Sequence, residues 1–465
     1  MVNILKTDNP EATLDLWLNK TVGESCARAD GGLSHSVPDG ILAVEYDYIQ
    51  YYLPAEPSIQ LIAIYCLSGD QLYFTVTESS LSFNHQLQSM TESLSGFHVF
   101  AVGNELPVLL LGNPLMLEAV SIAKPWGREI WYTGIEERGI SRVTDGLESA
   151  PLSWVLSTAP RRLAAHCERR INLLKILDPL PEEVYGDLYF ELHEEKREVY
   201  VVTHVDKQAW PSGVGAIRYG FNSDYRKTFS SDDDFKAAYL DKVKQYQVLR
   251  RQIDKHLDSD RKIEGVAPNE PVPSEVMKRW VSKLPHVVLA QEKELREEMN
   301  KFTALLPLEQ GDVVKVPLLT PHSLQHGVRT VEFQTPVYER IILSFAQKVL
   351  TQNHWDIERA VEIMSIDSPP VADLVVLEKT EEYRLEEVVR FNDFHVLRLT
   401  IWPGREYTLL PTQQYGLLMV VDGEVGCQRG VVTKEQALLL PAERRSIGLV
   451  NSSDRDVILL LASPR

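Results

Sequence analysis

The spacing of apolar residues along the chain predicts β-strands in most regions and helices in the middle. Short β-rich runs bounded by Pro, Gly and Asp occupy Ile41–Ile49, Ser58–Leu67 and Gln71–Thr77. Between Asp232 and Leu257 the period changes, because apolar residues recur every three to four positions, which is typical of an amphipathic helix. The run from Ser230 to Asp232 directly before it can supply an N-cap.

Further helices are expected later in the chain. The spacing predicts two over Ser274–Leu284 and Gln291–Leu305, and the charged, Pro-containing segment Asp258–Pro273 is expected to be an exposed connector. Strand character returns at Gly311, and another helix is expected after a cap near Asn353. The pattern therefore predicts a mainly β chain with helical insertions.

The last part of the chain, from Val371 onward, reads as short apolar strands that alternate with turns. Asp422-Gly423 is a hairpin signal, because both residues tolerate a positive φ. No His follows His395, so this closing β domain is expected to hold no metal.

Charge and composition narrow the classes of partner. The 66 acidic and 48 basic side chains give a formal net charge of -18, which opposes binding to nucleic acid or to an anionic membrane. No apolar run reaches the ~20 residues of a membrane helix, and the amino terminus lacks a secretory pattern. The four Cys form no C-x-x-C pair. We expect a cytoplasmic protein that acts on a small molecule, and its oligomeric state stays open.

The residues that carry chemistry begin at Gly186. If Leu188–Leu192 is a strand, period-two alternation directs Glu191 and His193 to the same face, and Glu198 can return to that face from the next turn. A later strand that ends in a Pro-bounded turn supplies His322. Carboxylate and imidazole ligands suit a divalent cation with mixed nitrogen and oxygen preference.

This set resembles the two metal-binding motifs of the cupin barrel. The first motif has two ligands separated by one residue, followed by a Glu, and the second is P-x-G-x-x-H, matched by Pro317 to His322. Glu191 stands in place of the usual first His, and Leu319 in place of the Gly. The two motifs occur in order, with a helical insertion between them.

A narrower resemblance is to type I mannose-6-phosphate isomerases. Lys124–Trp131 is similar to the K-P-W-G opening of that family, and Leu188–His193 occupies the place of its first ligand strand. Lys196-Arg197-Glu198 matches its K-x-E element, and Thr320–Gly327, with Glu332 after it, matches its later His motif. The resemblance runs from about Lys124 to the end of the chain.

The family resemblance implies roles for particular residues, which we carry over as expectations. One divalent ion is expected, with Zn²⁺ first and Mn, Fe or Ni as alternatives, and the activity implied is aldose–ketose isomerisation of a sugar phosphate through an enediol(ate). The implied residues are Glu191, His193, Glu198 and His322 as metal ligands; Glu332 as the base, with Lys196 and Arg340, as catalytic residues; and Trp126, Tyr189 and Gln334 as substrate-binding residues.

The same resemblance implies two cupin (jelly-roll β-barrel) domains and a helical insertion. The residues before them lie outside the resemblance, and their pattern predicts an amino-terminal α+β domain. The expected segments are 1–119, a mixed α/β domain of unknown role; 120–222 and 306–350, the metal-binding catalytic cupin; 223–305, the helical insertion; 351–370, a connecting helix; and 371–465, a cupin without metal ligands.

Departures from the family pattern leave alternatives open. Tyr189 replaces a Ser, Glu191 replaces a Gln, and the loop between His193 and Glu198 is short. An added negative charge beside a metal repels an anionic substrate. The alternatives are a non-catalytic or regulatory sugar-binding cupin, and a cupin with other metal-dependent chemistry such as an Fe²⁺ oxygenase. Arg340 could instead form a surface ion pair with Glu339.

Overall fold

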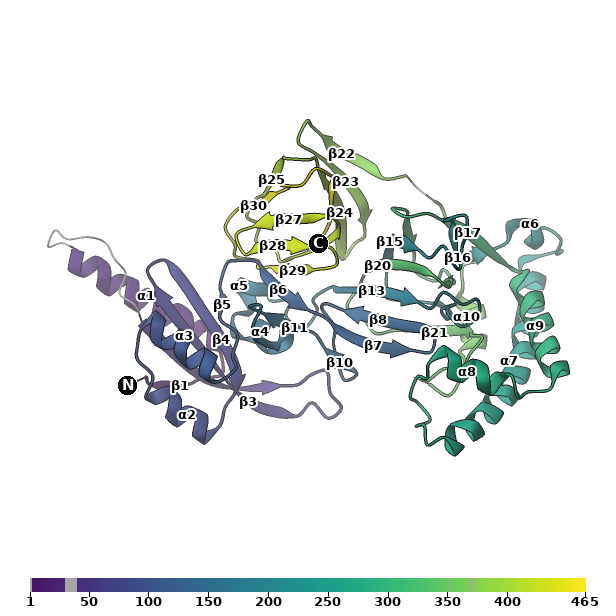
Figure 1. Cartoon of the computed structure of the whole chain (residues 1–465), viewed down its shortest axis with the longest axis horizontal. Helices are drawn as coiled ribbons and strands as arrows, with labels where there is room; N and C mark the ends of the chain where they lie inside the picture. Colours follow the sequence, from purple (N-terminus) through teal and green to yellow (C-terminus); the bar gives the residue numbers. More distant parts are fainter. Residues whose placement is uncertain (1, 30–39, 351, 368, 372) are drawn as a thin grey trace. The chain divides into compact units, whose positions relative to one another are not determined.

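A computed structural model describes residues 2–29, 40–350, 352–367, 369–371 and 373–465. Contacts between the elements divide the chain into two units (Figure 1): unit 1 is Met1–Val120, Trp131–Leu174 and Leu374–Arg465, and unit 2 is Ser121–Ile130 and Lys175–Asp373. The prediction of a mainly β chain with helical insertions is confirmed. Among the described residues, no helix is both long and apolar enough to cross a membrane. The finer domain boundaries given above stay a prediction.

Unit 1 begins with a five-stranded sheet in the order β1-β2-β3-β4-β5. β1 and β2 are parallel, which requires a crossover, and α1 supplies it. The three strands predicted here are confirmed by β2, β3 and β4, whose buried side chains pack against α2 and α3. The bounds are β1 Ile4–Lys6, α1 Pro10–Ala29, β2 Gly40–Ile49, β3 Ser58–Ser68, β4 Gln71–Glu78, α2 Leu81–Gln88, α3 Leu94–Gly103 and β5 Leu109–Leu110.

The rest of unit 1 is built on a nine-stranded sheet, ordered β12-β11-β6-β29-β26-β31-β24-β23-β22, and a four-stranded sheet, ordered β25-β30-β27-β28. Leu115 of β6 pairs with Leu439 of β29, so strands from distant parts of the sequence share one sheet. The bounds are β6 Leu115–Glu118, β9 Ile135–Glu136, β10 Gly139–Ile140, β11 Arg142–Thr144, β12 Ser149–Pro151, α4 Leu152–Thr158, α5 Pro160–Ala164, β22 Val375–Lys379, β23 Tyr383–Arg390, β24 Phe394–Ile401, β25 Glu406–Leu409, β26 Gly416–Asp422, β27 Glu424–Cys427, β28 Gly430–Thr433, β29 Ala437–Leu440, β30 Ile447–Val450 and β31 Val457–Pro464.

The hairpin predicted at Asp422-Gly423 is wrong. Gly423 has a φ of 80°, so the chain does turn there. The strands on either side belong to different sheets, however, because β26 pairs with β29 and β31 while β27 pairs with β28 and β30. The turn therefore passes the chain from one sheet to the other.

A buried carboxylate joins the amino-terminal segment to the rest of unit 1. Glu11, 5% exposed, accepts the backbone N–H groups of Arg161 at 2.8 Å and Arg162 at 3.0 Å, in the first turn of α5. The same two arginines reach Asp15 and Glu443. Glu11 thus caps a helix that lies 150 residues away in sequence.

Replacing Glu11 with alanine is expected to destabilise unit 1. Two hydrogen bonds to a buried, charged acceptor are lost together, and we expect the free energy of unfolding to fall by about 3 kcal/mol. Urea unfolding followed by circular dichroism measures the change. Glu424→Ala, an exposed substitution in the same unit, is the control and is expected to stay within about 0.5 kcal/mol of the parent. Equal stability of the two variants would contradict this role for Glu11.

Unit 2 contains two sheets that share one core. The six-stranded sheet has the order β18-β15-β20-β13-β8-β7, and the five-stranded sheet has the order β17-β16-β19-β14-β21. Leu177 and Val202 of the first pack in one cluster with Ile217, Leu324 and Ile342 of the second. The bounds are β7 Val120–Lys124, β8 Gly127–Trp131, β13 Leu173–Pro179, β14 Phe190–Leu192, β15 Glu198–Val205, β16 Gly215–Phe221, β17 Thr303–Leu308, β18 Val313–Val316, β19 His322–Leu324, β20 Val328–Gln334 and β21 Ile341–Ser344.

Helices enter unit 2 between β16 and β17, and Figure 1 shows α7, α8 and α9 lying together. The long amphipathic helix is confirmed as α7, and its N-cap Ser231 accepts the N–H of Asp234 at 3.1 Å. Phe235 and Tyr239 of this helix pack in one cluster with Leu192 and Leu343 of the five-stranded sheet. The bounds are α6 Ser223–Arg226, α7 Asp232–Ile263, α8 Ser274–Val281, α9 His286–Asn300 and α10 Ile357–Ile363.

Three expected boundaries in this region are wrong. α7 continues to Ile263, so the connector begins later than Asp258. α9 ends at Asn300, because the next residues form β17 and pair with β16, and this pairing overrides the helical spacing. α10 begins after Asp356 rather than near Asn353, and the Asp356 carboxylate accepts the N–H of Ile342 at 3.0 Å instead of capping the helix.

Candidate metal centre

Three candidate ligands converge in unit 2 from the five-stranded sheet. Glu191 of β14 and His322 of β19 are cross-strand partners, and His193 follows β14 directly. One ligand atom from each of these residues lies within 4.8 Å of the other two. This is the geometry that period-two alternation predicts for Glu191 and His193. The cluster is small enough for one cation to contact all three side chains.

Glu198, the fourth candidate, lies beside the two imidazoles. Its carboxylate is 3.0 Å from Nε2 of His322 and 3.5 Å from Nε2 of His193. It lies outside the group of three, and Lys196 Nζ contacts it at 2.6 Å. Burial alone raises the pKa of Glu198, but Lys196 and the two imidazoles outweigh burial and hold that pKa well below its usual range. Glu198 is therefore ionised.

The imidazoles present ring nitrogens that a metal can bind. The carbonyl of Thr320 can only accept, so Nδ1 of His322, 3.0 Å away, donates to it, and Nε2 faces Glu198 at 3.0 Å. Burial and the charge of Lys196 lower the pKa of His193 to about 4, so its ring is neutral at pH 7. Neither nitrogen of this buried ring has a hydrogen-bond partner among the described residues. The donor set therefore fits a divalent metal.

Leu319 adopts a backbone conformation that glycine favours. Its φ is 62°, in the left-handed region, at the position where the cupin motif carries Gly. The Leu319 N–H donates to the carbonyl of His193 at 2.7 Å, and its own carbonyl accepts the N–H of Ser365 at 2.8 Å. These bonds hold a conformation that costs a non-Gly residue about 1 kcal/mol or more. The departure at this position therefore leaves the turn before His322 intact.

Glu332 approaches the centre from the six-stranded sheet. It is 1% exposed, and it is the cross-strand partner of Tyr200. Lys175 Nζ lies 3.3 Å from its Oε2, whereas Oε1 has no hydrogen-bond partner among the described residues. Burial raises the pKa of Glu332 well above its usual range, and Lys175 opposes that rise. Burial thus favours the protonated carboxyl and Lys175 favours the carboxylate, and a general base must be able to adopt both forms.

Buried charged residues extend from Glu332 in a series of ion pairs, which the sequence did not indicate. Lys175 lies 4.0 Å from Glu129, which lies 3.3 Å from Lys124 of the K-P-W-G segment. Burial by itself lowers the pKa of Lys175, but Glu129 and then Glu332 outweigh it and raise that pKa above its usual value. A single Lys in the otherwise apolar run from Leu173 to Leu177 was the available signal.

Arg340 contacts the candidate metal centre through an ion pair with Glu191. Its Nε lies 2.8 Å from Glu191 Oε2, and its guanidinium lies 4.7 Å from the centre of the Tyr189 ring. Burial alone raises the pKa of Glu191, but Arg340, His193 and Lys196 together outweigh burial and lower that pKa. Gln334 donates to the carbonyl of Val337 at 3.1 Å, which holds the loop that leads to Arg340.

The short loop between His193 and Glu198 is fastened by a carboxylate. Glu339 accepts the backbone N–H groups of Glu194 at 2.9 Å, Glu195 at 2.8 Å and Lys196 at 3.3 Å. Successive N–H groups of this kind form an anion-binding concavity. Glu339 therefore fixes the loop that carries Lys196, which the sequence did not indicate.

Trp126 lies in the core between the sheets and is 1% exposed. Its indole N–H has no hydrogen-bond partner among the described residues. Gly127 beside it has a φ of 142°, and a Cβ there would lie 2.2 Å from the carbonyl oxygen of Asp178. Only glycine fits, which accounts for the Gly of the K-P-W-G segment.

Tyr200 forms a hydrogen bond to Glu198. Burial raises the pKa of its phenol well above the usual value, so the hydroxyl keeps its proton and donates to Glu198 Oε2 at 2.6 Å. Tyr200→Phe is expected to weaken zinc affinity by about 10- to 100-fold, the usual cost of losing a partner of a metal ligand. Competition with a chromogenic chelator measures it. Tyr239→Phe is the matched control, because that buried hydroxyl has no hydrogen-bond partner among the described residues. Equal zinc affinity of the two variants would contradict this role.

Comparisons with known proteins support the fold. No known family and no curated protein matches the sequence. Solved structures do match. Mannose 6-phosphate isomerase from Bacillus subtilis is 14% identical, with a TM-score of 0.51, over 75% of this chain and 99% of that chain. The apo form of mannose 6-phosphate isomerase from Salmonella typhimurium, and a mannose 6-phosphate isomerase bound with zinc and yttrium, are each 12% identical, with TM-scores of 0.52, over 76% of this chain and 99% of theirs. The chain therefore has the cupin-like fold of these isomerases.

Proposed function

We propose that this chain is a metal-dependent aldose–ketose isomerase that acts on a sugar phosphate. Mannose 6-phosphate and fructose 6-phosphate are the first substrates to test, and Zn²⁺ is the first metal. The observation that carries the proposal is the convergence of Glu191, His193 and His322 opposite the buried Glu332, in a fold similar to that of mannose 6-phosphate isomerases. The two-cupin architecture and the cytoplasmic location belong to the same proposal.

The chemistry required is the transfer of one proton between neighbouring carbons and of one proton between the oxygens that they carry. A bound divalent ion supplies a Lewis acid that stabilises negative charge on substrate oxygen. Glu332 takes the proton from one carbon and returns it to the next, and Lys175 keeps the carboxylate form accessible despite burial. Lys196 and Arg340 orient an anionic substrate.

The charged side chains linked by ion pairs around the candidate metal centre suit an anionic substrate. The formal charges balance before any metal is counted, so a divalent cation leaves an excess positive charge. The carboxylates are Glu129, Glu191, Glu198 and Glu332, and the cations are Lys124, Lys175, Lys196 and Arg340. This local balance differs from the net charge of -18 of the whole chain.

One observation favours a second candidate, a non-catalytic sugar-binding cupin. Arg340 is engaged by Glu191 and lies over Tyr189, and Lys196 is engaged by Glu198. A substrate phosphate must compete with these contacts. If it does not compete, the protein binds sugars without converting them.

The deciding experiment is turnover by metal-replete protein. Mannose 6-phosphate and a panel of hexose and pentose phosphates are offered, and ketose formation is followed with and without a chelator. Turnover that disappears on chelation supports the isomerase. Calorimetric binding of a sugar without turnover of any member of the panel supports the binding protein and overturns the isomerase.

A further inference from the structure

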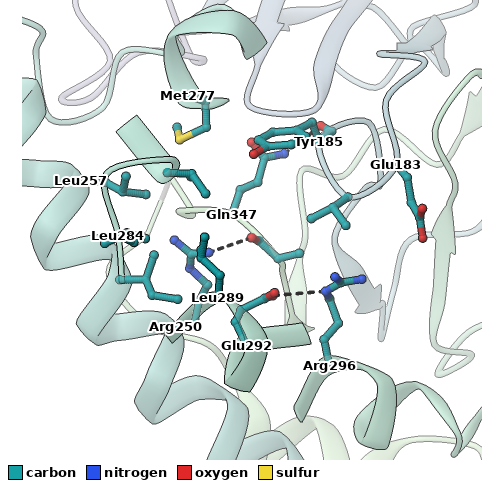
Figure 2. Close-up of a pocket in the computed structure, with 14 residues that line it drawn as sticks. Glu183, Tyr185, Arg250, Leu257, Met277, Leu284, Leu289, Glu292, Arg296 and Gln347 are labelled. Carbon is teal, nitrogen blue, oxygen red and sulfur yellow. Dashed lines mark hydrogen bonds and ion pairs between the residues drawn. The ribbon is translucent and has the colours of Figure 1, made fainter. Parts of the chain in front are cut away.

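A cavity of unit 2 lies among the inserted helices, and none of the candidate metal ligands lines it. It has a volume of about 170 Å³. Its walls come from α7, α8 and α9 and from two loops, at 183–185 and 346–347, and Figure 2 shows its apolar side chains converging. The aliphatic lining residues include Ile253, Leu257, Met277, Val281, Leu284 and Leu289. A dry cavity of about 150 Å³ accepts a molecule as large as benzene.

One wall of this cavity is the guanidinium of Arg250. The residue is 5% exposed, and it donates through Nε to Asp254 at 2.9 Å and through Nη1 to the carbonyl of Ala346 at 3.0 Å, the latter drawn in Figure 2. Nη2 lies 2.7 Å from Asp254. An arginine has five N–H donors, so these three contacts leave two without a partner among the described residues.

Three other polar residues of the cavity, Arg296, Glu292 and Gln347, form hydrogen bonds. Arg296 donates to Glu292 at 3.1 Å, and the hydroxyl of Tyr246 donates to the same carboxylate oxygen at 2.7 Å. Gln347 donates to the carbonyl of Tyr185 at 2.8 Å. Arg250 is the more buried of the two arginines that line the cavity, and its Nη2 is a buried nitrogen with no hydrogen-bond partner among the described residues.

We infer that this cavity binds a small monocarboxylate with an apolar body, such as an aromatic or branched short-chain acid. The planar fork of Arg250 matches a carboxylate, and the aliphatic walls bury a ring or a branched chain. A sugar phosphate does not suit these walls, because its hydroxyls find no partners there. The site does not depend on the function proposed above.

Benzoate is the probe, and benzyl alcohol is its neutral counterpart of similar size. Calorimetry on the full chain is expected to give benzoate a Kd of about 1 mM or tighter, which is an ordinary efficiency for so small a ligand. Benzyl alcohol is expected to bind at least about tenfold more weakly, and Arg250→Gln is expected to remove that difference. Absence of benzoate binding, or equal binding of the two probes to the parent protein, overturns the inference.

Filling the chamber gives an independent test. Leu284→Trp places a large ring in the cavity and is expected to abolish benzoate binding, whereas Val248→Trp, on an exposed position of α7, is expected to leave it unchanged. If Leu284→Trp does not fold, Leu289→Phe takes its place. Benzoate binding that survives a folded filling variant overturns the assignment. The filling variant is expected to keep the metal content of the parent protein. Loss of benzoate binding then reports on this cavity and not on the proposed isomerase site.

Discussion

Replacing His322 with alanine is expected to abolish stoichiometric metal binding and, with it, any isomerase activity. The residue lies in the middle of the candidate ligand set, beside Glu198 and opposite Glu191. Its Nδ1 donates to the carbonyl of Thr320, which fixes the ring with Nε2 facing Glu198. The loss in affinity should exceed the ~10- to 100-fold cost of removing a partner that only supports a ligand.

Elemental analysis after dialysis against metal-free buffer measures the occupancy. His204→Ala removes an exposed histidine of the same unit and is expected to retain full metal content. Glu198→Gln tests the ligand from the other sheet and is expected to lose the metal as His322→Ala does, because an amide cannot supply the negative charge. Full occupancy in both Glu198→Gln and His322→Ala would show that the ligand set is wrong.

Replacing Glu332 with glutamine is expected to lower kcat by about 10² to 10⁴-fold while metal content stays unchanged. The amide has nearly the same size as the carboxyl, but it cannot accept the substrate proton. Glu309→Gln makes the same change at an exposed position and serves as the control. Turnover by Glu332→Gln at the parental rate would exclude Glu332 as the base.

The pH profile gives Glu332 a second signature. The base is active without its proton, and burial raises its pKa, so activity is expected to rise with pH through that raised pKa. Lys175 holds the pKa down, and Lys175→Met should therefore move the acidic limb to still higher pH. If the acidic limb of the pH profile does not move in Lys175→Met, Lys175 does not set the pKa of the base.

The sequence indicated much of the fold because periodicity is a local property. The stripe from Phe235 to Leu257 predicts α7, since one buried face suffices to define a helix. The same reasoning fails at Leu305, which continues the stripe in sequence but lies in β17, where pairing with β16 decides the conformation. The helix cap expected near Asn353 is wrong for a similar reason. The helix begins after Asp356, and the Asp356 carboxylate accepts the N–H of Ile342 in β21 instead of capping the helix.

For the candidate site, the sequence indicated the residues that lie close together within the motifs. The charged residues that contact them from distant parts of the chain were found only in the structure. Glu191 and His193 are two residues apart, so alternation alone relates them. Glu129 and Lys175 come from β8 and β13 and meet only after these strands share a sheet. Glu339 accepts a hydrogen bond from the backbone of Glu194, although it lies 145 positions later in the sequence. Contacts of this kind depend on tertiary packing, which a local pattern cannot express.

The position of the helical insertion bears on how unit 2 folds. The chain leaves β16 at Phe221 and returns to β17 at Thr303, and these two residues are cross-strand partners. Closing a flexible loop of about 80 residues costs roughly 2.5 kcal/mol more than closing a hairpin of a few residues. The β16–β17 pair is therefore expected to form late, once α7 and α9 have packed and brought its ends together. Destabilising changes confined to this pair should speed unfolding much more than they slow folding.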